Sequence, residues 1–207
     1  MEHVDIPDGE RHEPKGAGGA AANQVLKSVG SGATQFGFIT IDSMPGVASR
    51  GFERVLDSAS TALNQNPVAL DTPLQVEFGP LQATASCTLA ADGTLTFNEA
   101  GTYGLNLFVR YGRTAGAGNA IVLTRVLKND VQVLNTNAIS LPDANATYPF
   151  SAFLIFDAVP GDTFKLQIAR DSAGVNNGGL VRTLITTLPW NLSSSATLAV
   201  YKHRGLE

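Results

Sequence analysis

The chain has 207 residues, of which 43% are hydrophobic and 15% are charged, and its formal net charge is −4. This acidic balance argues against non-specific nucleic-acid binding, which relies on a basic surface. Cys87 is the only cysteine, which excludes an intramolecular disulfide framework and a zinc site built on several cysteines. The apolar runs are too short for a transmembrane helix, so we expect no insertion into a membrane.

Residues 1–22 are expected to form an extended arm. Pro7 and Pro14 each lack a backbone donor and push the preceding residue out of the helical region. Residues 16–22 are all Gly or Ala, so this run has almost no side chain to bury and becomes ordered only against a partner or its own domain. The arm lacks the apolar core of a secretion signal, and we expect synthesis in a cytoplasm.

Residues 23–65 are expected to form a neck or collar between the arm and a larger domain. Short apolar runs at 24–26 and 36–39 flank a Gly-Ser-Gly turn at 30–32 and predict a small hairpin. Because an isolated hairpin is marginally stable in water, we expect this one to pair with another segment.

Residues 49–64 are the helix candidate of the chain. The serines in this segment are weak helix formers, so an irregular strand connection is the alternative. The apolar residues that recur at helical spacing are Phe52, Val55, Leu56, Ala59 and Leu63.

Residues 66–207 form the expected head domain, a series of strands and tight turns. About eight to ten strands at intervals of roughly 8–15 residues predict an all-β sandwich or barrel. The turn signals are Asp92-Gly93, Asn129-Asp130 and Pro160-Gly161-Asp162. The clearest strand alternates almost strictly, and its apolar face would consist of Tyr103, Leu105, Leu107, Val109 and Tyr111.

Two of the expected strands, at 121–127 and 150–159, are apolar on both faces. A strand in a two-sheet sandwich has one inward and one outward face, so apolar outward residues need cover. We therefore predict an oligomer interface that includes Val126, Phe153 and Ile155. Cover by the N-terminal segments of the same chain is the alternative.

Residues 171–179 form a polar loop between two expected strands. Long loops often carry function, so Asp171, Asn176 and Asn177 are candidate ligand-binding residues. A mobile connector without a ligand is the alternative.

No catalytic residue, metal ligand or cofactor site is predicted. The three histidines, His3, His12 and His203, do not have the spacing of a metal triad. Asp162 is expected to serve the turn that follows Pro160 and not as half of a catalytic carboxylate pair. The chain also lacks the Gly-x-Ser-x-Gly and phosphate-loop motifs.

Three stretches resemble the tumour-necrosis-factor-like and complement-globular-head jelly roll. They are Phe97 to Tyr103, Arg125 to Val133, where Asp130 replaces the usual Gly, and Ala158 to Leu166. The resemblance implies a jelly-roll β-sandwich that assembles as a homotrimer.

The front of the chain resembles tailed-bacteriophage virion proteins of the head-fibre, decoration and tail-fibre types. The resemblance lies in residues 5–16 and 66–79. It implies a capsid decoration or head-fibre protein on the virion surface, with an outward head. A tail-fibre protein that binds the host surface is the alternative. The implied attachment residues are Asp5, Ile6, Pro7, Asp8, Gly9, Glu10, Arg11, His12, Glu13 and Pro14.

Overall fold

The computed structural model describes residues 25–30, 33–37, 52–113, 117–183 and 189–203, in two compact units made of residues 1–49 and 50–205. In the first unit, β1 (Val25–Gly30) pairs with β2 (Ala33–Gly37) as an antiparallel hairpin. The hairpin predicted around the Gly-Ser-Gly turn is therefore confirmed, and its partner segment stays a prediction.

The second unit is all-β in the residues that the structure describes, as the strand pattern predicted. Its strands are β3 (Phe52–Ser60), β4 (Asn64–Gln65), β5 (Leu74–Gln75), β6 (Gln82–Ala83), β7 (Cys87–Leu89), β8 (Leu95–Phe97), β9 (Gly101–Arg113), β10 (Ala120–Lys128), β11 (Val131–Gln132), β12 (Asn137–Leu141), β13 (Tyr148–Ala158), β14 (Thr163–Arg170), β15 (Gly178–Val181) and β16 (Ala196–His203).

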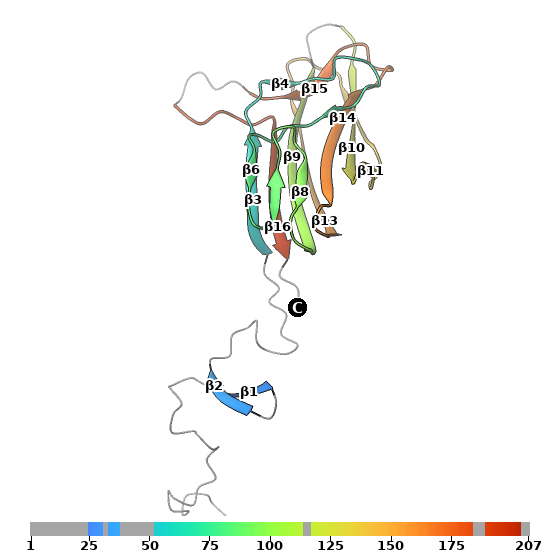
Figure 1. The fold of residues 1–207 in the computed structure, drawn as a ribbon. Helices are drawn as coiled ribbons and strands as arrows, with labels where there is room; N and C mark the ends of the chain where they lie inside the picture. Colours follow the sequence, from blue (N-terminus) through green and yellow to red (C-terminus); the bar gives the residue numbers. More distant parts are fainter. Residues whose placement is uncertain (1–24, 31–32, 38–51, 114–116, 184–188, 204–207) are drawn as a thin grey trace, which may run out of the picture. The chain divides into compact units, whose positions relative to one another are not determined.

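These strands form two antiparallel sheets (Figure 1). The six-stranded sheet has the order β3-β16-β9-β15-β4, and β13 also pairs with β9. The eight-stranded sheet has the order β11-β10-β14-β8-β7-β6, with β12 on β10 and β5 on β14. Figure 1 shows β13 at the same flank as β10 and β11, whereas β3 and β6 lie at the opposite flank. The finer jelly-roll classification stays a prediction.

One hydrophobic core lies between the two sheets. The five alternating residues of β9, from Tyr103 to Tyr111, are all buried, as their pattern predicted. They pack in one cluster with inward residues of the other sheet such as Phe97, Val122 and Ile168. The Tyr111 and Thr124 hydroxyls share a hydrogen bond of 2.7 Å between the sheets, so this inward polar residue is satisfied.

Residues 52–60 form strand β3, so the helix considered for residues 49–64 is wrong. β3 pairs with β16 along its whole length, and a bulge at Val55 shifts its alternation by one residue. Because of this shift, the apolar residues of the segment recur at a spacing close to that of a helix. The pairing with β16 nevertheless makes the segment a strand. Residues 52–65 also belong to the second unit, so the segment expected as a neck contributes two strands to the sandwich.

The three predicted turns are present. Asn129 and Asp130 have φ of 51° and 63°, as a two-residue type I′ turn requires. Val159 accepts a hydrogen bond from the Asp162 N–H across Pro160 and Gly161, as in a type II turn. The Asp92-Gly93 hairpin pairs β7 with β8 as expected, but its loop has three residues, because the Ala90 N–H bonds to the Thr94 carbonyl.

Candidate functional site

The outer face of the six-stranded sheet carries an apolar surface centred on β13. Phe153 and Ile155 are 54% and 59% exposed, as the prediction of outward apolar residues requires. Phe52, at the start of β3, is 49% exposed, and its ring lies edge-on to Phe153 and to Tyr201 at 6.4 Å each. We call Phe52, Phe153, Ile155 and Tyr201 the β13 surface.

Gly104 makes room for the aromatic rings of the β13 surface. It lies in β9 between Ile155 of β13 and Tyr201 of β16. A Cβ atom at this position would lie 2.8 Å from Cζ of Phe153, so any larger residue would force this ring to move. The rings therefore contact one another across the sheet, with the His203 ring 5.1 Å from the Phe52 ring and the Arg54 guanidinium 6.0 Å from the Tyr201 ring.

β13 is incompletely covered on its inward face and at one edge as well. Its inward side chains, including Phe150, Leu154 and Phe156, are only partly buried although they pack against the core. β9 pairs with one edge of β13 along eleven residue pairs, and within the described residues no strand pairs with the other edge. A long strand with an unpaired edge is a common site of association.

Val126 does not belong to this surface, so its assignment to an interface is wrong. It is 8% exposed and lies in the core, opposite Leu166 of β14. The even-numbered residues of β10 point inward, so the outward residues of this strand include Leu123 and Arg125.

The polar loop at 171–177 is held by hydrogen bonds within the loop and to neighbouring segments. Asp171 Oδ1 accepts from the Ala173 N–H at 2.7 Å, and Asn176 Nδ2 donates to the Ala117 carbonyl at 2.7 Å. The Ser172 N–H donates to Asp71 Oδ1 at 3.2 Å. The side chains of Asp171 and Asn176 thus hold the loop in place, and the neighbouring Ser172 fixes Asp71. The predicted ligand role of Asp171, Asn176 and Asn177 stays a prediction.

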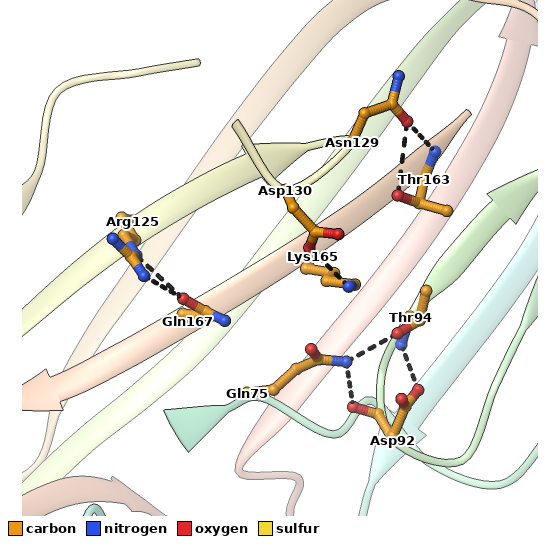
Figure 2. Close-up of polar contacts among 9 residues, drawn as sticks. All are labelled: Gln75, Asp92, Thr94, Arg125, Asn129, Asp130, Thr163, Lys165 and Gln167. Carbon is orange, nitrogen blue, oxygen red and sulfur yellow. Dashed lines mark hydrogen bonds and ion pairs between the residues drawn. The ribbon is translucent and has the colours of Figure 1, made fainter. Parts of the chain in front are cut away.

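A groove of about 210 Å³ lies over strands β10 and β14 of the eight-stranded sheet. Within it, Arg125 Nε and Nη2 donate to Gln167 Oε1 at 2.9 and 2.8 Å, and Figure 2 shows these two side chains pointing toward each other. The lining residues are Asp71, Pro73, Leu123, Thr124, Arg125, Gln132, Thr136, Gln167, Ile168 and Ala169.

Polar pairs surround this groove on the same sheet. Lys165 Nζ and Asp130 Oδ1 form an ion pair at 2.7 Å, and the Thr163 N–H donates to Asn129 Oδ1 at 2.8 Å (Figure 2). Gln75 Nε2 donates to the Asp92 carbonyl at 2.7 Å, which ties the β7–β8 hairpin to β5. These polar groups bond to one another and do not fill the groove. The groove therefore remains a hollow within this polar region.

The Asp162 carboxylate joins the β10–β11 turn to the β13–β14 turn. It accepts hydrogen bonds from Asn129 Nδ2 at 2.7 Å and from the Val159 N–H at 3.0 Å, and it pairs with the Lys128 ammonium at 2.9 Å. The contacts with Asn129, Lys128 and Val159 lower the pKa of Asp162 from 3.8 to about 2. This geometry confirms the turn role that the sequence predicted.

We expect Asp162→Asn to be less stable than the wild type at pH 7 and to depend less on pH below 4. The pKa of Asp162 is lower in the folded chain than in the unfolded one. Its contribution is therefore fully present above about pH 4 and is lost as the pH falls toward 2. Urea unfolding at pH 7, 4, 3 and 2 measures this difference. An equal loss of stability in both proteins between pH 4 and 2 would contradict it.

Within the described part of the chain, no group of three or more His, Cys, Asp or Glu side chains is placed to hold a metal ion. The same residues include no helix long and apolar enough to cross a membrane. Cys87 is fully buried, and this burial raises the pKa of its thiol. The attachment residues proposed at 5–14 lie outside the described residues.

No protein-family model matches this chain, and a search of curated proteins also finds no match.

The sequence analysis did not identify several residues of the β13 surface and of the groove. Phe52 was assigned to a helix face, and Gly104 was not among the candidate site residues. Arg125 and Gln167 each lie among apolar residues of their strands, and this pattern was the available signal for an outward polar pair. Asp71 and Ala169 carried no local signal, because the groove depends on strand pairing.

Proposed function

We propose that this chain is a non-enzymatic structural protein of a tailed-bacteriophage virion, a homotrimeric capsid decoration or head-fibre protein. The sandwich is its outward head, and residues 1–22 attach it to the particle. The observation that carries the proposal is the β13 surface together with the edge of β13 that no described strand pairs with, since both suit association with further copies of the chain.

Burial of the β13 surface between subunits would contribute a favourable free energy of association. Full burial of a Phe or Ile side chain contributes about 1.5–3 kcal/mol. Phe52, Phe153 and Ile155 are each about half exposed. Their burial would thus contribute roughly 2–5 kcal/mol per subunit. The partly buried inward side chains of β13 add to this, and so do the backbone groups at the edge that no strand of the described residues pairs with.

The resemblance to trimeric jelly-roll heads supports three copies and not two. The resemblance of residues 5–16 to phage virion proteins supports attachment through the arm. Mixed charges on an extended peptide suit a groove or sheet edge of a capsid protein, where they form hydrogen bonds and ion pairs. Three arms on one trimer would multiply a weak contact.

A tail-fibre or receptor-binding protein is the second candidate. The groove on the eight-stranded sheet favours it, because that sheet faces away from the β13 surface. A trimer formed through β13 would leave such a groove open to a host molecule.

Deletion of residues 1–22 is expected to abolish binding to virions while the head still associates. The reason is that the arm and the β13 surface are separate parts of the chain. Sedimentation velocity measures the association of the truncated chain, and antibody labelling of virions in the electron microscope locates the full chain. Label over the capsid supports the decoration role, whereas label at the tail supports the second candidate. Absence of label from virions, or virion binding without the arm, would contradict the proposal.

A further inference from the structure

The floor of the groove is formed by two cross-strand pairs of β10 and β14. Leu123 lies opposite Ala169, and Arg125 lies opposite Gln167. The methyl group of Ala169 is the smallest side chain of these four. The floor is therefore deepest at the apolar pair of Leu123 and Ala169. The floor thus offers an apolar half and a polar half side by side.

The walls of the groove are fixed by hydrogen bonds to the backbone. On one side, Asp71 is held by the Ser172 N–H and by its own N–H, which donates to the Arg170 carbonyl at 2.8 Å. On the other side, Gln132 Nε2 donates to the Leu134 carbonyl at 2.7 Å and to Thr136 Oγ1 at 3.1 Å. A ligand therefore meets side chains that are already ordered, which lowers the entropic cost of binding.

The polar lining combines donors with acceptors. Arg125 supplies guanidinium N–H groups, and two of them donate to the neutral amide oxygen of Gln167. Asp71 supplies a carboxylate, and the Gln132 side chain supplies an amide carbonyl. The described lining residues include one cation and one carboxylate, which does not suit a multiply charged anion. They include no aromatic ring on which a nucleobase would stack.

We propose that this groove binds one sugar residue of a saccharide. Sugar hydroxyls both donate and accept, so they match the mixture of Arg125, Asp71 and Gln132, while the C–H face of the ring covers Leu123 and Ala169. The volume of about 210 Å³ is below the roughly 300–1,000 Å³ of pockets for drug-sized molecules, which limits the site to a single ring. This inference stands on the groove alone and does not depend on the virion role.

Saturation-transfer NMR on the full chain tests the proposal with four free sugars: glucose, galactose, N-acetylglucosamine and glucuronate. We expect saturation of the ring protons of at least one of them. Ala169→Leu fills the hollow in the floor and is expected to abolish the signal. Gln132→Ala, at an exposed position, removes one wall contact and is expected to weaken binding about tenfold, as the loss of one good hydrogen bond would.

Lys165→Gln is the matched control, because Lys165 lies on β14 beside the groove but does not line it. This variant is expected to bind as the wild type does. Absence of saturation with all four sugars would overturn the proposal. Saturation that persists in Ala169→Leu, or an affinity of Gln132→Ala equal to that of the wild type, would also overturn it, because the sugar would then bind elsewhere.

Discussion

Gly93→Ala is expected to destabilise the sandwich by about 3–5 kcal/mol, a loss at the upper end of what single substitutions cause. Gly93 has φ of 85°, and a Cβ atom there would lie 1.8 Å from the Val76 carbonyl oxygen. The obstructing atoms belong to the backbone, so no side-chain rotation relieves the overlap. The hairpin cannot move away easily, because Gln75 Nε2 holds it through the Asp92 carbonyl.

Gly161→Ala is the control that separates backbone strain from overlap. Gly161 has a similar φ of 92°, but no atom lies within 4 Å of an added Cβ. Its replacement should therefore cost only the penalty of a left-handed conformation, about 1–2 kcal/mol. Urea unfolding at pH 7 measures both variants. Equal losses in the two variants would mean that the contact between Gly93 and Val76 is not important.

The position of Gly93 illustrates what the sequence predicts and what it does not. The Asp-Gly signal is local, so the hairpin between β7 and β8 was predicted correctly. The contact with Val76 depends on the segment after β5 passing under the hairpin, which no local pattern reports. The turns at Asn129 and Pro160 were likewise predictable, because the backbone φ angles of a tight turn depend on the residues within the turn itself.

Strand alternation was predictable where polar residues stayed on one face. In β9 every inward residue is large and apolar, so its period is unambiguous. In β10 the inward face includes Thr124, which is satisfied by Tyr111 across the core, and the outward face includes Leu123. Because a polar residue points inward and an apolar residue points outward, the sequence pattern did not reveal which face of β10 is inward. Val126 was therefore placed on the wrong face. The bulge in β3 concealed the strand in the same way.

The two surfaces differ in how far the sequence could predict them. Phe153 and Ile155 alternate with inward residues of β13, so their exposure followed from the pattern. Their neighbours Phe52 and Tyr201 come from strands far away in the sequence, and only sheet order places them together. The groove depends on the same kind of information, because its floor comes from β10 and β14 and its walls come from separate segments on either side of them.

Ile155→Glu is expected to convert the assembled protein to a monomer without unfolding it. In a single subunit the side chain is 59% exposed, so a carboxylate at this position remains hydrated. In an assembly that covers the β13 surface, the same carboxylate would be buried without a partner. A cost of at least about 3 kcal/mol for each contact would lower the association constant more than 100-fold. Sedimentation equilibrium measures the mass, and thermal unfolding followed by circular dichroism measures the fold.

Val68→Glu is the matched control, because Val68 is an apolar side chain that is 95% exposed and does not belong to the β13 surface. It introduces the same charge and should leave the assembly intact. If both variants remain assembled, the β13 surface is not the interface. If the wild type itself is monomeric, self-association fails as a basis for the virion role, whereas the sugar site is unaffected, since it needs only the pairing of β10 with β14 within one subunit.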